Sequence, residues 1–370
     1  MKAPRPALVA AALILAVATA SAQDTLRIRD KDGKVSEKQG EVVSLNHKTV
    51  EYEIDVGGTR AKQPEDARNV VEIVPDQNGR TFDFIQAELA FNNGDWEQAI
   101  ERFERVRRDQ RARELLKQIA AINVVKANWG AGNAPATVAA AKALRQEKPD
   151  SFYVRESFEI EILANLSRND IAGAGAAITA FEEKGKTDGM PEWAKSAEVK
   201  RARLLELQNK HREALVIHRK YVRDRDAGDE ATLGELRCLK EVADWAGLNG
   251  RAESVISEAK GKKSFSARVL TGAYNARAEA ALNNGRVKDA LLDFLQGAMV
   301  LNKSGETSLE HEASLARGAV ACAKMAASEK EKPKKDTYKM RAMELVDELK
   351  KFYPGSKMLR AAMEEIQAVK

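Results

Sequence analysis

Histidines and cysteines are the residues of this 370-residue chain that could hold a metal or carry out catalysis. His311-Glu312 begins a zinc-binding pattern, but no second histidine follows one helical turn later, so the pair of imidazoles that such a site needs is missing. His211 and His218 are seven residues apart, which is two helical turns, and we expect them to cover or cap packing. With only four histidines and no ligand spacing, the sequence predicts neither a metal site nor a cofactor.

The other chemical motifs lack the partners that catalysis requires. Ser257-Glu-Ala-Lys260 fits the SxxK pattern of acyl-enzymes, but the supporting motifs are absent. Gly173-Ala-Gly175 resembles half of a phosphate-binding loop, yet it lacks the third glycine. Cys238 and Cys322 are predicted to be small buried residues in helices, with a disulfide as the open alternative. We therefore predict that the chain is not an enzyme. A hydrolase or transferase whose site is not local in sequence is the alternative.

The first 22 residues have the pattern of a signal peptide. Lys2 and Arg5 precede an apolar run over residues 7–18, and Ala20-Ser21-Ala22 is a small-x-small cleavage site. The run is shorter than the ~20 apolar residues that a membrane-spanning helix needs. The sequence thus predicts cleavage before Gln23, an exported chain that is periplasmic or secreted, and no transmembrane span in the mature chain. An uncleaved anchor is the alternative.

Charge and composition narrow the classes of partner. The chain has 61 Lys and Arg against 56 Asp and Glu, a net charge of +5 that is spread along the sequence rather than gathered in a stripe. Nucleic-acid binding calls for a concentrated basic surface, so we expect no nucleic-acid partner. Hydrophobic residues make up 44% and recur with a period, which excludes a disordered chain.

Residues 23–76 are expected to form a small all-β, barrel-like domain. Polar and apolar residues alternate in four runs, over residues 25–29, 41–45, 49–56 and 70–74, as half-buried strands require. Asp32-Gly33 and Gly57-Gly58 are hairpin signals. Five short strands are expected, with residues 63–66 as a turn before the last one. The order of these features resembles the Sm-like and SH3-like small barrels. Breaker residues at 75–80 mark the boundary to a helical region, 77–370.

An internal repeat runs through the helical region. Asn-Asn-Gly ends a helix at Gly94 and again at Gly285, and weaker copies place turns in between. The six predicted turn residues are Gly94, Gly132, Asn169, Asn209, Gly250 and Gly285, at intervals of 35 to 41 residues. Glycine and asparagine best tolerate the left-handed conformation that follows a helix end. A period of this length indicates a solenoid of helical hairpins.

The repeat resembles the tetratricopeptide repeat (TPR) family. Ala99 with Phe103, and Ala290 with Phe294, match the small residue and the later aromatic of the family's second helix. Trp96, Pro149 and Pro354 also match its pattern, whereas the Gly132 and Gly250 copies depart from it. The resemblance covers about residues 81–355. It implies a mainly α protein: a TPR-like α-solenoid of about seven hairpins with a capping helix from Lys357. A charged loop is expected at 328–336.

The resemblance also implies a function. TPR superhelices bind peptides in the groove that their first helices line, so we expect an exported scaffold for protein or peptide partners. Offsets from the turns place seven partner-binding residues there: Phe84, Glu88, Phe91, Asn92, Lys126, Trp129 and Arg203, with Ile122 beside them. Packing of Phe91 and Trp129 between hairpins stays open as an alternative, as does a structural role in an envelope assembly complex with the β-domain as its docking part.

Overall fold

The computed structural model describes residues 23–31, 33–261, 265–304, 308–353 and 356–368, with the side chains of 301–304 excepted. The predicted signal peptide and Pro354 lie outside the described residues. The chain divides into two compact units. The first holds residues 23–131 and 143–154, and the second holds residues 132–142 and the described chain from Arg155 onward.

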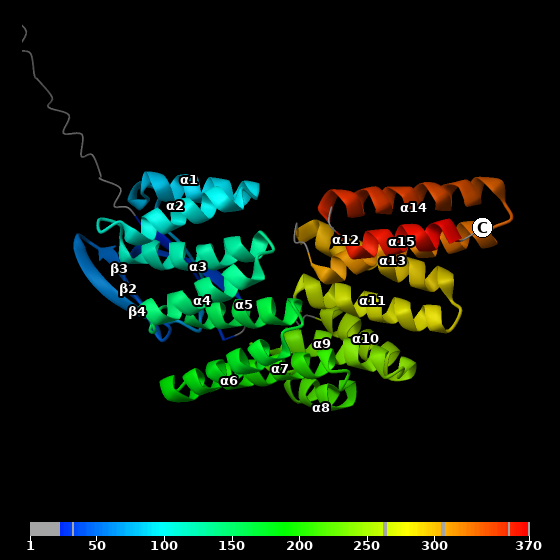
Figure 1. Cartoon of the computed structure of the whole chain (residues 1–370), viewed down its shortest axis with the longest axis horizontal. Helices are drawn as coiled ribbons and strands as arrows, with labels where there is room; N and C mark the ends of the chain where they lie inside the picture. Colours follow the sequence, from blue (N-terminus) through cyan, green and yellow to red (C-terminus); the bar gives the residue numbers. More distant parts are fainter. Residues whose placement is uncertain (1–22, 32, 262–264, 305–307, 354–355, 369–370) are drawn as a thin grey trace, which may run out of the picture. The chain divides into compact units, whose positions relative to one another are not determined.

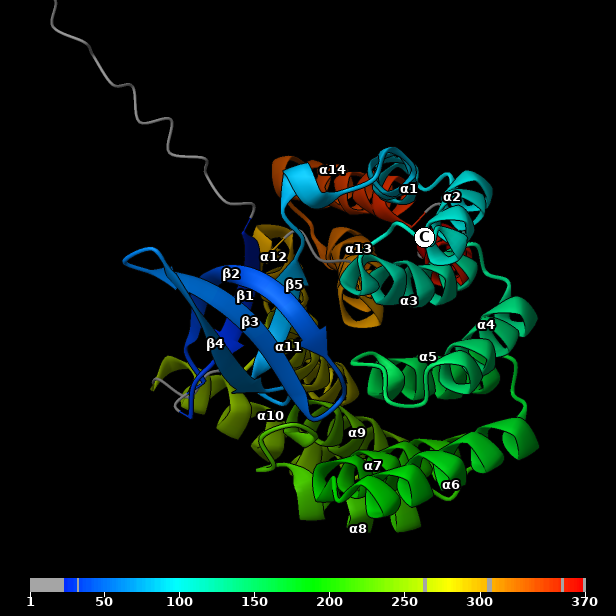
Figure 2. The ribbon, with the colours of Figure 1, turned by 90° about the vertical axis from the view of Figure 1, so that its left-hand side faces the viewer.

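The first unit begins with a five-stranded antiparallel sheet (Figure 2). Its strands are β1 (Asp24–Arg29), β2 (Val35–Leu45), β3 (Thr49–Val56), β4 (Thr59–Asp66) and β5 (Val70–Val74), in the order β4-β3-β2-β1-β5. The long strand β2 pairs with β1 up to and including Gly40 and with β3 from Glu41 onward. A Cβ at Gly40 would lie 2.6 Å from the Tyr52 ring, so glycine lets the two halves of β2 serve different neighbours.

The turn expected at residues 63–66 is wrong, because these residues complete β4. Pro64 pairs with Glu51 of β3 in the register of the two strands. Strand β4 is an edge of the sheet. Proline lacks a backbone N–H, but an edge strand needs such groups only on its inner side, so Pro64 is tolerated there.

A buried carboxylate joins the sheet to the helices that follow. Asp24 is fully buried, and it accepts hydrogen bonds from the backbone N–H groups of Val42 at 2.8 Å and Asp76 at 2.9 Å. Its other partner is Arg113, which binds both carboxylate oxygens, at 3.0 and 2.5 Å. Gln118 adds a bond from its side chain to the Leu45 carbonyl. The sheet is therefore fastened to the helical chain at several points.

The segment between sheet and helices is a short 3₁₀ helix, η1 (Gln77–Gly79). Asp76 caps it by accepting from the N–H groups of residues 78 and 79. Arg80 donates to the Pro75 carbonyl and pairs with Glu88 at 2.8 Å. The domain boundary at 76/77 stays a prediction, and the contacts place the sheet in one compact unit with the first helices.

Consecutive helices joined by short turns form seven hairpins, followed by a last helix, in the part of the chain that the structure describes (Figure 1). The fold class predicted from the sequence is thus confirmed: a TPR-like α-solenoid after a small sheet. The hairpins are α1 (Phe82–Asn93) with α2 (Trp96–Arg108), α3 (Glu114–Gly130) with α4 (Ala134–Glu147), α5 (Val154–Ser167) with α6 (Ile171–Asp188), α7 (Pro191–Leu207) with α8 (His211–Tyr221), α9 (Gly228–Glu241) with α10 (Trp245–Lys260), α11 (Ala267–Asn283) with α12 (Val287–Ser304), and α13 (Leu309–Ser328) with α14 (Lys332–Phe352); α15 (Lys357–Ala368) follows. Among the described helices, none has the length and apolarity to cross a membrane.

Five of the six predicted turn residues have the expected left-handed backbone, and Gly250 does not. Gly250 lies inside α10, and the turn before that helix is at Ala243, with φ of 57°. Alanine has a Cβ that disfavours this conformation, so residue type gave no signal there. The Asp244-Trp245 pair that follows repeats Asp95-Trp96 after Gly94, and this is the signal that could have located the turn.

Two positions after each turn form the packing slot of the second helix. They lie five and nine residues beyond the left-handed residue, and all twelve side chains are at most 1% exposed. In turn order the pairs are Ala99 and Phe103, Thr137 and Ala141, Ala174 and Ile178, Ala214 and His218, Leu248 and Ala252, and Ala290 and Phe294. The slot thus repeats by position even where the residue type changes.

The charged loop expected at 328–336 is also wrong. Helix α13 ends at Ser328 and α14 begins at Lys332, so only three residues separate them and Lys334 and Lys335 are helical. Pro333 stands in the first turn of α14, where a missing N–H costs nothing. Cys238 and Cys322 are free and buried, as the sequence predicts.

Candidate functional site

A cleft of about 180 Å³ opens between first helices in the second unit. Its walls come from α9, α11, α13 and α15, and Phe294 of α12 contributes to the floor. Small side chains of α13 and α15, among them Ala316 and Ala362, also line it.

Alternating charges cross the cleft. Glu279 of α11 pairs with Lys240 of α9 at 3.2 Å and with Arg317 of α13 at 3.5 Å, and Arg317 also pairs with Glu365 of α15 at 3.3 Å. Asn275 donates to the Glu310 carbonyl at 2.7 Å. These half-exposed ion pairs are weak in water and can exchange for bonds to a ligand. The arrangement suits polar backbone groups and charged side chains of a peptide.

The two aromatic residues predicted on α1 pack inside the first hairpin. Phe84 is fully buried, with its ring centroid 6.0 Å from that of Phe103 in an edge-to-face contact. Phe91 is half-buried and makes similar contacts with Phe103 at 6.3 Å and Trp96 at 5.4 Å. Phe84 therefore offers no surface to a partner, and its placement in the groove needs correction. Counting back from the turn gave the correct helix but the wrong face for this residue.

The other predicted residues keep some exposed surface. Asn92 is exposed and Trp129 is 37% exposed, while Glu88, Lys126 and Arg203 are half-buried. Glu88 pairs with Arg80, and Arg203 pairs with Glu206. Ile122 is in the core. Of the seven residues, the structure gathers Phe84, Glu88, Phe91, Asn92, Lys126 and Trp129 in the first unit, and it places Arg203 in the second.

Sequence reasoning missed the cleft residues Lys240, Asn275 and Glu279. Counted from the turn at Ala243, Lys240 has the same offset as Phe91 and Trp129 from theirs; Asn275 and Glu279 have the offsets of Phe84 and Glu88, counted from Gly285. The misplaced turn at Gly250 hid Lys240. The turn at Gly285 gives the other two positions. The signal was present in the sequence for all three residues.

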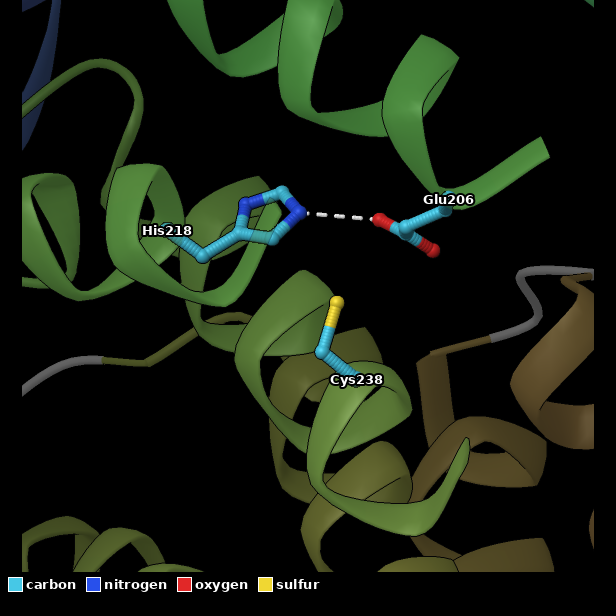
Figure 3. Close-up of side chains that lie close together, drawn as sticks. All are labelled: Glu206, His218 and Cys238. Carbon is cyan, nitrogen blue, oxygen red and sulfur yellow. Dashed lines mark hydrogen bonds and ion pairs between the residues drawn. The ribbon is translucent and has the colours of Figure 1, made fainter. Parts of the chain in front are cut away.

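A second feature of interest is a buried polar cluster of Glu206, His218 and Cys238, which α7, α8 and α9 supply (Figure 3). One potential ligand atom from each residue lies within 4.8 Å of the others. His218 Nε2 is 2.8 Å from a Glu206 oxygen. Gly234 of α9 makes room for the imidazole, since a Cβ there would lie 2.2 Å from the ring.

Arginines complete the ion pairing of Glu206. Arg237 donates from Nε at 2.8 Å and from a terminal nitrogen at 3.1 Å, and Arg203 binds the same carboxylate. Burial alone would raise the pKa of Glu206, but hydrogen bonds from His218 and Arg237 and the charges of both arginines outweigh it and lower this pKa to about 2. Burial, aided by the Glu206 charge, raises the pKa of the Cys238 thiol to about 12.

These surroundings do not fit a metal ion. A metal binds a thiolate, whereas the Cys238 thiol holds its proton far above neutral pH. Both oxygens of Glu206 already face guanidinium groups, whose charge would repel a cation. The same protonated thiol is a poor nucleophile. The cluster is best described as an internal ion pair that ties three helices together. Its members come from three helices, so no local sequence motif could predict the cluster.

The histidine of the incomplete zinc pattern is also buried. His311 is 2% exposed at the start of α13, and its Nδ1 lies 2.9 Å from the Tyr353 hydroxyl. Burial lowers the pKa of His311 below its usual value. The Tyr353 hydroxyl donates to the Ser308 carbonyl and accepts from the Ser308 N–H. This contact holds the end of α14 against the start of α13, which is a packing role.

Comparisons with known proteins return only distant structural likenesses. No family model matches the sequence, and no curated protein matches it either. A tetratricopeptide repeat protein from Parabacteroides merdae is 13% identical, with 77% of this chain and 97% of that chain covered and a TM-score of 0.49. PilW, a type IV pilus biogenesis factor, is 10% identical, with 68% and 100% covered and a TM-score of 0.42. The C-terminal part of a TPR protein from Cytophaga hutchinsonii is 12% identical, with 75% and 98% covered and a TM-score of 0.37.

Proposed function

We propose that the chain is an exported scaffold that binds a peptide or protein segment in the cleft between its first helices. The observation that carries this proposal is the charged cleft of the second unit, where Lys240, Glu279, Arg317 and Glu365 follow one another across four helices. An extended segment presents backbone donors and acceptors with charged side chains, and this surface offers partners for both.

Binding without catalysis accords with the chemistry of the buried groups. In the described chain, Glu206, His218 and Cys238 bring together a carboxylate, an imidazole and a thiol. All three are closed to solvent, and the carboxylate is already paired with His218. The thiol stays protonated at neutral pH. The open cleft presents the charged groups of Lys240, Glu279, Arg317 and Glu365 already paired with one another, an arrangement that suits the binding of a charged segment.

A structural role in an envelope assembly is the second candidate, and the N-terminal sheet favours it. The sheet has two edge strands, β4 and β5, and β4 carries the exposed cations Arg60 and Lys62. An edge strand can accept another chain by strand addition. On this proposal the sheet, an Sm-like or SH3-like module, docks the scaffold on a larger complex while the helices hold a client.

Site-specific photo-crosslinking tests the cleft. A photoreactive residue replaces Ala313, which lines the cleft, and in a matched control it replaces Val216, which is 72% exposed on α8. Both proteins are exposed to envelope extract and irradiated. We expect one defined adduct from position 313, lost when Arg317→Glu reverses the central charge and kept with Arg360→Glu on the exposed face of α15. Equal adducts from both positions would rule the cleft out.

Export has a separate test. N-terminal sequencing of the protein from an envelope fraction should begin at Gln23, because the small residues Ala20 and Ala22 precede that bond. Protein that starts at Met1, or that stays with the cytoplasmic fraction, contradicts export. It would leave the cleft proposal standing, since binding does not depend on the compartment.

A further inference from the structure

The outer face of α1 carries three large apolar side chains in contact with solvent. Phe82 is 72% exposed, Ile85 is 44% exposed and Leu89 is 53% exposed. Their spacing of three and four residues puts them on one stripe of the helix. Isolated exposed hydrophobic residues are ordinary, but a continuous stripe on one helix face indicates a contact surface. We call these three residues the α1 stripe.

The equivalent face of an interior hairpin is buried. Counted from the turn at Gly285, the positions of the α1 stripe correspond to Ala273, Ala276 and Ala280 of α11. All three are at most 7% exposed and belong to the core that α11 shares with α9 and α10. In an interior hairpin, this face therefore packs on the preceding hairpin. Helix α1 has the same face but with larger side chains.

An apolar groove lies at the opposite end of the helical repeat. It has a volume of about 450 Å³, its floor is the end of α13, and α14 and α15 form its sides. Met343 and Val346 of α14 and Met363 of α15 line it, and Met343 is 68% exposed. The lining of α14 runs from Lys335 to Lys350, which spans roughly 22 Å at 1.5 Å per residue. We call it the terminal groove.

The terminal groove exists because one packing contact of the stack is missing. Helix α11 packs closely on α10, and α13 packs closely on α12. Helix α15 instead packs on α13 and scarcely touches α14. The side of α14 that should receive the next first helix is thus open. A first helix with large side chains would fill this wide groove better than one with alanines.

Charge favours α1 as that helix. Lys335 and Lys339 stand on the edge of the terminal groove and form no ion pair among the described residues. Helix α1 contains the acids Asp83 and Glu88 and no basic residue. Asp83 pairs with Arg102 of α2, and Glu88 pairs with Arg80 just before α1. The side chains of Asp83 and Glu88 nevertheless remain 36% and 31% exposed. Lys350 also lines the groove, where it pairs with Asp347 at 3.2 Å, so Lys335 and Lys339 are the cations left for a partner's acids.

We infer that copies of this chain associate head to tail, with the α1 stripe of one copy seated in the terminal groove of the next. The contact joins two different surfaces, so each bound copy leaves a free stripe and a free groove. Such heterologous contacts build open chains unless the rotation closes a ring. The inference is independent of the proposed cleft, which uses other residues.

Sedimentation velocity of the purified chain tests the association. At roughly 10–100 µM we expect an average mass that rises with concentration to at least twice that of a single chain. Leu89→Glu, in the stripe, and Met343→Glu, in the groove, should each weaken association by at least about tenfold, as the loss of an interface anchor does. The matched controls are Val216→Glu on α8 and Met340→Glu on α14. Both replace an exposed apolar residue that lies outside the α1 stripe and the terminal groove. High salt should weaken the contact.

Mixing the Leu89→Glu and Met343→Glu variants tests whether the contact joins two different surfaces or two copies of the same surface. The Leu89→Glu copy keeps its groove, and the Met343→Glu copy keeps its stripe. Each should be monomeric alone, and the mixture should form a dimer with one copy of each and nothing larger. A chain that stays monomeric throughout this concentration range overturns the inference. So does a dimer that only one of the two variants disrupts, or an effect of Met340→Glu equal to that of Met343→Glu. Circular dichroism of each variant confirms that it is folded.

Discussion

Hairpins α1–α2 and α7–α8 place different residues in the same slot. Nine residues beyond the turn, the first hairpin has Phe103, which packs edge-to-face on Phe84 and Phe91. The later hairpin has His218, which binds Glu206 instead. Both side chains are fully buried. The backbone geometry of a helical hairpin thus accepts an aromatic ring or a hydrogen-bonded imidazole at one position.

The difference changes what holds each hairpin together. Phe103 stabilises its hairpin through apolar area and ring contacts, which do not depend on pH. His218 does so only while Glu206 is ionised and Arg237 neutralises the carboxylate. A buried ion pair is costly to break but adds little beyond well-packed apolar residues.

The largest effect is expected from Glu206→Ala. It leaves Arg237 and His218 without their buried partner, and such a loss typically costs about 3–5 kcal/mol. Phe103→Ala should cost a similar amount, about 3–5 kcal/mol, by leaving a cavity. Urea denaturation gives both values, and hydrogen exchange should locate each loss in its own hairpin. Adding His218→Phe and Arg237→Met to a Glu206→Leu change should restore most of the stability. If Glu206→Ala costs under about 1 kcal/mol, the ion pair does not hold the hairpin.

Acid should weaken the His218 hairpin selectively. The folded-state pKa of Glu206 is about 2, below its usual value of 4.5, so the unfolded chain binds this proton first as pH falls. The stabilisation is therefore complete above about pH 5 and is lost as pH falls from there toward 2, on the order of 3 kcal/mol in all. We expect the difference in unfolding free energy between the native chain and Glu206→Gln to shrink over this range. A difference that stays constant with pH would contradict the assignment.

A methyl group opposite the imidazole should have a moderate effect. Gly234→Ala places a Cβ 2.2 Å from the His218 ring, so the ring must move, and overpacking of this kind costs about 1–3 kcal/mol. Gly175→Ala is the matched control, because its nearest new neighbour is Leu204 at 3.8 Å. That change should be neutral or stabilising, since alanine favours a helix interior. Thermal unfolding distinguishes the two. Equal melting temperatures would mean that the ring has room to move.

The smallest effect is expected at Val216, two residues before His218 on the same helix. Its side chain is 72% exposed, so Val216→Ser should change the unfolding free energy by no more than about 0.5 kcal/mol. The same denaturation measurement gives this value. A larger loss of unfolding free energy would show that α8 tolerates no substitution well. The losses expected from changes at the Glu206–His218 contact would then not be specific to the packing slot.

The sequence predicted the architecture well because its signals are local. Gly and Asn tolerate the left-handed backbone best, and five of the six left-handed turns between paired helices carry one of them. Alternation located β1, β3, β5 and the second half of β2, but it missed residues 35–40 of β2 and the whole of β4, whose last residues, 63–66, were predicted as a turn. Ala243 shows the limit of prediction from residue type: its φ is 57°, although alanine disfavours the left-handed region.

The functional surfaces were harder to predict, since they depend on contacts between helices distant in sequence. The cluster of Glu206, His218 and Cys238 spans three helices, and a motif search inspects one at a time. Phe84 shows the other difficulty. An aromatic residue on a first helix fits a groove or a core equally well by offset, and only the contact with Phe103 decides.

Asp24 has a consequence for the order of events during biogenesis. On the proposed route of export, one residue, Gln23, separates the cleaved bond from this carboxylate, which is fully buried against Arg113. A leader peptidase must hold the chain extended on both sides of the bond it cuts. A folded sheet would withhold Asp24 from that active site. On this route we expect cleavage to precede folding of the first strand, and a precursor that folds early to keep its leader.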